Sequence, residues 1–396
     1  MQQRIMARGL SRRRATFSIY LVTFFVTLHY ALGLYITSSY LTIFVPQWSV
    51  GILYTLGSLL AMLLLGYSAR LLRRHGLYRV TVRSFAILLV ATLLLAAAEW
   101  LHNSLLALMS FFLVYLFTNF ERFLLDEYME EYSSDKKTGS LRGVFLTVMN
   151  VAIMLAPLAA GFLVDGDGFH KVFLIAALMI AIGLATAIFS FRRMPEHRPT
   201  PAPFLPTLCA AARHRNVSNI IAIHFLLQFF YAIMTIYMPI YLHEVIGFGW
   251  PVIGIIFAIM LSPFVLIELP LGWVADRLLG EQELLVFGFS VLALATATIP
   301  FLGYASLPLF AIVLFLTRIG AASIEIMCET YFFKQVNDRQ AGLISLFRNC
   351  QPFAYVIAPA LATLFLLRWD TRALFWGLAL LMLLGIYHSL RLRDTR

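Results

Sequence analysis

Charged residues are scarce in this chain. Asp, Glu, Lys and Arg make up 13% of its 396 residues, about half of the roughly 25% that is typical of soluble domains. The mean hydropathy is +0.84, and repeated apolar runs of about 20 residues match the roughly 30 Å hydrocarbon core of a bilayer. This composition excludes an ordinary soluble protein and predicts an integral membrane protein.

Features that define several other protein classes are also missing. The three cysteines, Cys209, Cys328 and Cys350, have unrelated spacings, so neither a metal site nor a disulfide framework is indicated, and we expect no cofactor. The sequence has no H-E-x-x-H motif and no convincing nucleophile elbow, which argues against an enzyme. It has no G-x-x-x-x-G-K-[ST] loop, so energy from nucleotide hydrolysis is not expected.

The alternating ten-residue strands of a membrane β-barrel are absent from the sequence. Backbone groups in lipid must be hydrogen-bonded internally, so the long apolar runs are expected to be helices. The basic N-terminus, MQQRIMARGLSRRRATF, is followed by an apolar run without a small-residue cleavage site. We therefore expect an all-α membrane protein and no removable signal peptide.

Charged, Gly and Pro breaks between the apolar runs predict twelve membrane-spanning helices. With both termini on one side, that side receives 24 of the 30 Lys and Arg residues, the other side three, and the spans three. Cytoplasmic loops carry the excess of Lys and Arg, so both termini are predicted to be cytoplasmic. The net charge of +10 then reflects topology, and no nucleic-acid binding is expected. The predicted spans are 17–41, 48–68, 80–99, 104–125, 142–164, 170–191, 218–243, 250–272, 283–303, 306–329, 341–366 and 372–390.

The chain is predicted to consist of two six-helix halves. A Pro- and Arg-rich connection at 193–217 separates an N-terminal bundle, 1–192, from a C-terminal bundle, 218–396. An internal repeat supports this division, because residues 30–41 align with 231–242 at a shift of 201. At a shift of 202, Glu127 aligns with Glu329 and Pro157 with Pro359. Matches in three helix pairs at nearly one shift are hard to obtain by chance.

The segment 272–280, GWVADRLLG, places an acid and a base next to each other after the eighth span. It resembles the G-x-x-x-D-R motif of the major facilitator superfamily, and the resemblance covers essentially the whole chain. It implies twelve helices in two bundles that rock about a central site. In that family the motif recurs between spans two and three. Here the counterpart is Gly66–Arg74, with Arg70 where the acid should stand.

The resemblance assigns these residues to a cytoplasmic gate. Gly272 allows close helix approach and Asp276 accepts from amides at the start of span five, while Arg277 pairs with a carboxylate. Because Arg70 cannot replace an acid, we expect only one such gate contact, the one made by Asp276 and Arg277. We expect the basic residues of the first half to bind phospholipid. A positive-inside cluster with one solvated ion pair is the alternative. The remaining gate candidates are Gly66, Arg70, Arg74, Glu127 and Glu329, with Lys137 and Arg339 as partners of the two glutamates.

Span five offers a weaker resemblance. Residues 152–161, AIMLAPLAAG, look like the small-residue pattern of proton-coupled exporters in the same family, with Ala replacing several Gly. Small residues at this spacing also serve ordinary helix packing, and Pro157 bends the helix. The pattern therefore favours export only weakly.

Polar residues follow one face of spans one, four, seven and ten, at spacings of three, four or seven residues. In the resembled family these four helices line the central cavity. The side chains expected to contact solute there are Thr27, Tyr30, Asn119, Arg122, His224, Gln228, Tyr231, Arg318 and Arg348.

Ionisable groups inside membrane spans are costly, at least about 2.5–3.5 kcal/mol each, and normally face a partner or water. We expect Arg318 and Arg348 to bind solute or act as counter-charges. Glu325 is the expected proton-coupling group, since burial favours its protonated form and an approaching arginine favours its ionised form. Glu121 and Glu268 are further candidates, and static ion pairs, including one between Arg122 and Glu121, are the alternative. His29 is expected to be a packed, hydrogen-bonded histidine.

These features predict a secondary active transporter for a small organic solute, working by alternating access. Buried carboxylates and the exporter-like span five favour proton-coupled antiport resembling drug efflux. The alternative is a uniporter or proton symporter for a sugar, amino acid or organic anion. Expected partners are the solute, protons and membrane lipids, and we expect a monomer in the inner (plasma) membrane that crosses it several times.

Overall fold

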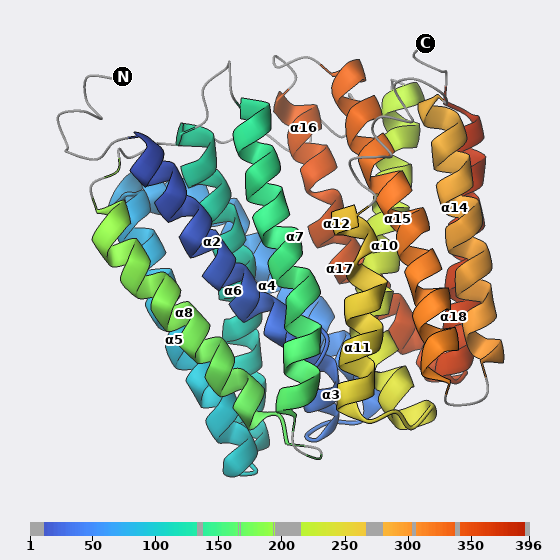
Figure 1. Ribbon diagram of the computed structural model, residues 1–396, viewed down its shortest axis with the longest axis horizontal. Coiled ribbons are helices and arrows are strands. Elements are labelled where there is room, and N and C mark those ends of the chain that lie inside the picture. Colours follow the sequence, from blue (N-terminus) through green and yellow to red (C-terminus); the bar gives the residue numbers. More distant parts are fainter. Residues whose placement is uncertain are drawn as a thin grey trace. The chain divides into compact units, whose positions relative to one another are not determined.

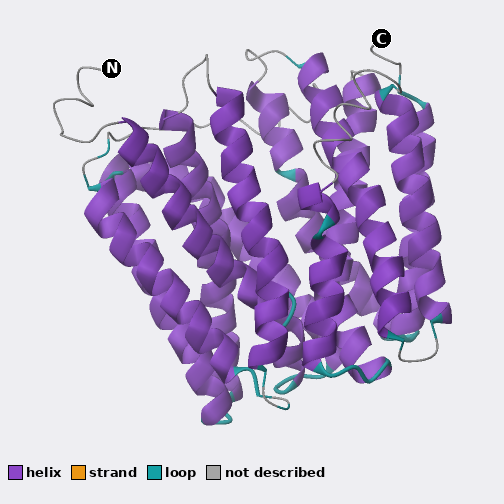
Figure 2. Cartoon of the chain, in the orientation of Figure 1, coloured by secondary structure: helices purple, strands orange, loops and turns teal. Residues whose placement is uncertain are grey.

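The computed structural model describes residues 12–132, 138–164, 166, 168–192, 194, 215–266, 280–302, 306–336 and 341–392. This part of the chain is largely helical (Figure 2). Eleven of its helices are long and apolar enough to cross a membrane. The chain divides into two units: unit 1 covers Met1–Pro46 and Leu56–Pro201, and unit 2 covers Gln47–Thr55 and Ala202–Arg396.

Unit 1 is an antiparallel bundle (Figure 1). α2 packs against α7 and α8, and α5 packs against α6 and α8. Its core contains large apolar side chains such as Phe85, Phe120 and Phe191, each exposed by 1% or less. Its elements are α2 (Arg12–Leu34), α3 (Thr37–Thr42), α4 (Gln47–His75), α5 (Leu77–Trp100), α6 (Ser104–Tyr132), α7 (Thr138–Leu163) and α8 (His170–Phe191).

Unit 2 repeats this packing, with α10 against α17 and α18, and α14 against α15 and α18. The first two turns of α4 belong to this unit, where Thr55 donates a 3.1 Å hydrogen bond to the carbonyl of Val356. Its other elements are α10 (Arg215–Ile240), the π-helical turn η1 (Tyr241–Val245), α11 (Trp250–Leu261), α12 (Pro263–Leu266), α14 (Glu281–Thr298), the 3₁₀ turn η2 (Ile299–Phe301), α15 (Leu307–Gln335), α16 (Ala341–Arg348), α17 (Cys350–Leu366) and α18 (Thr371–Leu390).

Local sequence explains several helix ends. Gly76 follows α4 with φ +81°, a conformation that other residues rarely adopt, and its N–H bonds to the carbonyl of Leu72 at 2.9 Å. Asp370 caps α18 by accepting a 2.8 Å hydrogen bond from the amide of Ala373. A glycine pair allows close helix contact: a Cβ at Gly320 would lie 2.6 Å from the carbonyl oxygen of Gly288, so α14 and α15 touch through their backbones.

The predicted spans match these helices with three interruptions, one of which falls in the eighth span at Ser262, between α11 and α12. The first span breaks at Tyr35 and Ile36. Here the hydroxyl of Thr37 donates a 2.8 Å hydrogen bond to the carbonyl of Gly33, in competition with the backbone hydrogen bonds of the helix. The eleventh breaks after Arg348, because Pro352 has no N–H for the carbonyl of Arg348 and its ring would clash with it. The eighth span is described only to Leu266, which leaves twelve spans unconfirmed.

Candidate functional site

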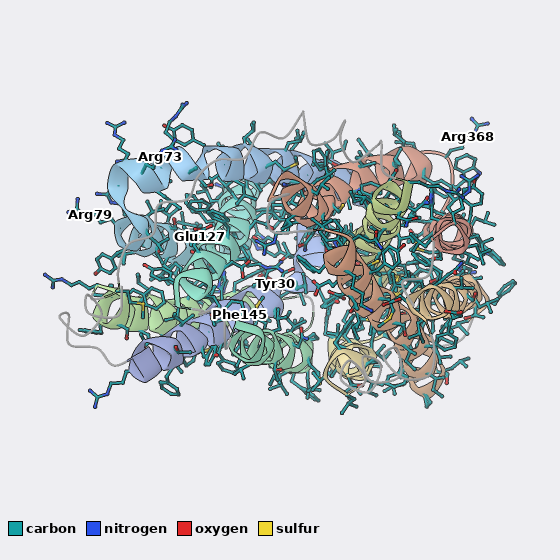
Figure 3. All side chains as sticks on the ribbon, turned by 90° about the horizontal axis from the view of Figure 1, so that it is seen from above. Tyr30, Arg73, Arg79, Glu127, Phe145 and Arg368 are labelled. Carbon is teal, nitrogen blue, oxygen red and sulfur yellow. The ribbon has the colours of Figure 1, made fainter. Side chains whose placement is uncertain are left out.

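Unit 1 contains a cavity of about 130 Å³ between α2, α6 and α7. Tyr30 of α2 and Phe145 of α7 lie near one another at this place (Figure 3). The cavity has a polar side from α2 and α6 and an apolar side from α7. Its walls are Thr23, Val26, Thr27, Tyr30, Thr118, Arg122, Leu125, Asp126, Phe145, Leu146 and Met149.

Arg122 occupies the cavity wall by lying over the ring of Tyr30. Its guanidinium carbon is 5.4 Å from the ring centroid, a distance at which a cation is attracted to the face of an aromatic ring. A guanidinium has five N–H donors at its edges. The contact with Tyr30 holds the positive charge at the cavity wall.

Two hydroxyls of the cavity wall have no hydrogen-bond partner among the described residues. They belong to Thr23 on α2 and Thr118 on α6, both at most 5% exposed. Buried polar atoms are normally paired with protein or water. The cavity volume of about 130 Å³ is well above the roughly 10–15 Å³ that one water requires, so several waters fit. A bound polar ligand or water therefore fits this wall better than an empty apolar space.

The two residues of span four that were expected to contact solute, Asn119 and Arg122, have different surroundings in the structure. Arg122 and Asp126 line the cavity, but Asn119 donates to the carbonyl of Tyr115, 2.8 Å away on its own helix. The residue that sequence reasoning missed is Thr118. A strict i, i+4, i+8 spacing, 118–122–126, would have identified it.

Unit 2 carries a second polar cluster, centred on Tyr231 of α10. The phenol donates a 2.7 Å hydrogen bond to Oε2 of Glu325 on α15. The guanidinium of Arg318, also on α15, lies 5.3 Å from the centroid of the Tyr231 ring and 5.5 Å from that of Phe230. The sequence predicted all three polar residues, and the structure brings them together.

Arg318 is 1% exposed, and its Nε and Nη2 atoms have no hydrogen-bond partner within the described ranges. Burying such donors unpaired is costly. The ring contacts stabilise the charge but do not use these donors. An oxyanion placed at the edge of this guanidinium would satisfy them.

His224 and Gln228 lie on the same helix and are each 7% exposed. The ring of His224 stacks on Phe347 at 4.0 Å, and Phe347 stacks in turn on Phe332 at 4.2 Å. His224 is therefore the end of an aromatic stack that joins α10, α16 and α15. Arg348, the next residue of α16, is exposed.

Glu121 is fully buried, and neither carboxylate oxygen has a hydrogen-bond partner in the part of the chain that the structure describes. The alternative of a static pair between Glu121 and Arg122 is therefore wrong for this structure. Neighbouring positions of a helix point about 100° apart, and Arg122 faces Tyr30 instead. An ionised carboxylate is costly to bury without a partner, so Glu121 remains a candidate for binding a proton.

The histidine of span one behaves as predicted. His29 is 4% exposed, and its Nδ1 lies 3.1 Å from the carbonyl oxygen of Ala176 on α8. This hydrogen bond ties α2 to α8 and confirms a packed structural histidine.

Three of the expected gate residues, Gly272, Asp276 and Arg277, lie outside the described residues. So do Lys137 and Arg339, the expected partners of Glu127 and Glu329, and the proton-coupling candidate Glu268. On α4, a Cβ at Gly66 would meet no described atom within 4 Å. Arg70 and Arg74 are exposed, and Arg70 lies over Tyr67 at 5.3 Å. Nearby, Arg73 and Arg79 point outward from unit 1 (Figure 3). Glu127 is partly buried and Glu329 is exposed.

Solved structures with a similar fold are transporters. A transporter of the POT family in complex with 5-aminolevulinic acid superimposes with a TM-score of 0.77 at 14% identity, over 95% of both chains. The POT family transporter PepTSo superimposes with a TM-score of 0.76 at 12% identity, over 96% of this chain and 97% of that chain. These identities establish the likeness of fold alone. No curated protein sequence matches the chain.

The family model described as Major Facilitator Superfamily matches residues 17–265 and, in an overlapping match, 251–396. Together these matches extend over nearly the whole chain, in agreement with the helical architecture and the sequence resemblance. The chain therefore belongs to the major facilitator superfamily.

Proposed function

We propose that this multi-pass membrane protein is a proton-coupled symporter for a small organic solute that carries a carboxylate. Membership of the superfamily indicates a transporter rather than an enzyme. The observation that carries the proposal is the cluster in which Tyr231 contacts both Arg318 and Glu325. It combines an anion-binding group with a protonatable group in one unit.

The two groups have complementary roles in the proposal. Arg318 has buried donors without partners and attracts the solute carboxylate. Glu325, when protonated, does not compete for that arginine. Loss of the proton makes Glu325 a second anion beside Tyr231. The ionised Glu325 then competes with the solute for the positive charge of Arg318, which favours release of the solute. Proton and solute therefore bind together and leave together.

Symport replaces the antiport that the sequence favoured. The exporter-like pattern of span five was its main support, and Ala152, Ala156 and Ala160 are at most 1% exposed on α7, which packs against α2. Helix packing accounts for these small residues without an export function. The buried carboxylates fit either coupling mode.

The direction of a pH gradient separates the possible modes. Purified protein in sealed liposomes would be given a panel of radiolabelled organic acids, amino acids and sugars, with the interior alkaline, acidic or at the external pH. Symport predicts accumulation of a carboxylate solute only when the interior is alkaline. Accumulation only in acidic vesicles would establish antiport, and equal uptake at all three settings would establish uniport.

A further inference from the structure

The cavity of unit 1 combines a positive and a negative group in one wall. Thr118, Arg122 and Asp126 follow one another on α6 at intervals of four residues, and all three line the cavity. Four residues correspond to a rise of about 6 Å. The arginine and the aspartate are therefore about one turn apart on a single face, with Thr118 on the other side of Arg122.

Among the side chains that the structure describes, the other two helices add no charge to this wall. α2 contributes Thr23, Val26, Thr27 and Tyr30, and α7 contributes only Phe145, Leu146 and Met149. The ionic side chains that the structure describes in the cavity wall are thus Arg122, which is partly buried, and Asp126, which is exposed. A simple anion would be attracted by Arg122 but repelled by Asp126, and a simple cation would meet the opposite pair of forces.

The unpaired hydroxyls identify this space as a built polar site. Thr118 lies next to Arg122 along α6, and both its hydroxyl and that of Thr23 are buried without a partner among the described residues. A hydroxyl donates one hydrogen bond and accepts others, so it suits either end of a doubly charged ligand. The cavity volume of about 130 Å³ admits a short-chain molecule.

We infer that this cavity binds a zwitterionic amino carboxylate, with its carboxylate at Arg122 and its ammonium group toward Asp126. The inference rests on the proposed function, because it names the class of solute, and it adds a binding site in unit 1 that is separate from the one formed by Arg318 and Glu325 in unit 2. It also assigns Thr118 as a donor to the carboxylate, and it gives the Tyr30 contact a purpose, which is to fix the guanidinium at the cavity wall.

Three compounds of one chain length test the charge pattern. 4-Aminobutyrate carries both charges, butyrate only the negative one, and butylamine only the positive one. Binding to the purified full-length protein would be measured by calorimetry at pH 7 without any gradient, with alanine and dialanine as shorter and longer zwitterions. At least one zwitterion is expected to bind about tenfold more tightly than butyrate and butylamine, since each charge-assisted hydrogen bond contributes about 1.5–3 kcal/mol, or roughly tenfold or more.

Single-charge variants give the sharper result. Arg122→Gln should weaken zwitterion binding about tenfold and shift the preference to butylamine, while Asp126→Asn should weaken it and shift the preference to butyrate. A merely structural role would not reverse the ligand preference in opposite directions. Thr118→Val should also weaken binding. The matched control is Thr92→Val, because that buried hydroxyl already bonds to the carbonyl of Leu88 at 2.8 Å on its own helix.

Three results would overturn the inference: no zwitterion binds, butyrate binds as tightly as the zwitterions, or the two charge variants do not reverse the preference. Thermal unfolding of each variant ensures that lost binding is not lost folding. Equilibrium binding is independent of coupling. Zwitterion binding without pH-driven uptake would contradict only symport, whereas pH-driven uptake of another solute without zwitterion binding would contradict only this inference.

Discussion

The phenol of Tyr231 donates a 2.7 Å hydrogen bond to Oε2 of Glu325. The face of the same ring carries the guanidinium of Arg318 at 5.3 Å. One tyrosine therefore contacts an acid through its hydroxyl and a base through its π-face. In the proposed mechanism this arrangement links the protonation of Glu325 to anion binding by Arg318, and each group can be tested separately.

Glu325→Gln is expected to abolish uptake driven by a pH gradient while sparing solute exchange. The amide oxygen still accepts the Tyr231 hydrogen bond, so the fold is retained, but the side chain no longer binds and releases a proton. Uptake into alkaline liposomes and counterflow of labelled against unlabelled solute measure the two activities. The matched control is Glu283→Gln, an exposed position in the first turn of α14. Normal pH-driven uptake by the Glu325 variant would remove this residue from the coupling mechanism.

Tyr231→Phe is expected to move the pH dependence of uptake without abolishing binding. The ring that supports Arg318 is kept, but the hydrogen bond that stabilises the ionised carboxylate is lost. The midpoint of the pH dependence should therefore move to higher pH. Initial uptake rates from pH 5 to 9 would show the shift. An unchanged profile with lower uptake at every pH would instead mean that the phenol serves only binding.

The internal repeat allowed the common architecture of the two units to be predicted from the sequence. The shift of 201 aligns Tyr40 with Tyr241, and the shift of 202 aligns Phe173 with Phe375. The structure adds equivalent edge contacts, at 4.9 Å between Tyr40 and Phe173 and at 5.1 Å between Tyr241 and Phe375. Aromatic spacing predicted the common architecture because both units place these rings on the same helices.

The polar clusters could not be predicted in the same way. Tyr30 and Tyr231 align, and each carries an arginine, at 5.4 and 5.3 Å. The arginines themselves do not align: Arg122 corresponds to Ile324, and Arg318 to Leu116. A long flexible side chain can reach the same ring from a different turn of its helix, so sequence spacing identifies the helix face but not the contact.

The alternative of an ion pair between Glu121 and Arg122 failed for a related reason. Its neighbour Arg122 made a local ion pair reasonable, but consecutive helix residues face different directions. The packing of α6 buries the acid and turns the base toward α2. Only the rotation of the helix about its axis, which tertiary packing determines, decides between these outcomes.

Gly320→Leu is expected to destabilise unit 2. Gly320 and Gly288 bring the backbones of α14 and α15 together, and an added side chain would collide with the carbonyl of Gly288 and with Leu292. Overpacking of this kind typically costs about 1–3 kcal/mol. Thermal unfolding in detergent should show a lower midpoint. Gly66→Ala is the matched control, because its Cβ meets no described atom and alanine favours the helix; equal midpoints for the two variants would contradict the close contact.

Lys334 and Glu281 form an ion pair that joins the end of α15 to the start of α14. Glu281 is 4% exposed, whereas the Lys334 side chain is 47% exposed. Removal of the lysine leaves a buried acid without this partner, but solvent at the lysine limits the loss. Lys334→Met is therefore expected to cost about 1–2 kcal/mol of unfolding free energy, more than Arg83→Met at an exposed site on α5.

In a double-mutant cycle with Glu281→Gln, the double variant should be less destabilised than the sum of the two single variants, because the second substitution removes the buried charge. Strictly additive losses would mean that the two side chains contribute independently and that the contact between them does not stabilise the junction of α14 and α15.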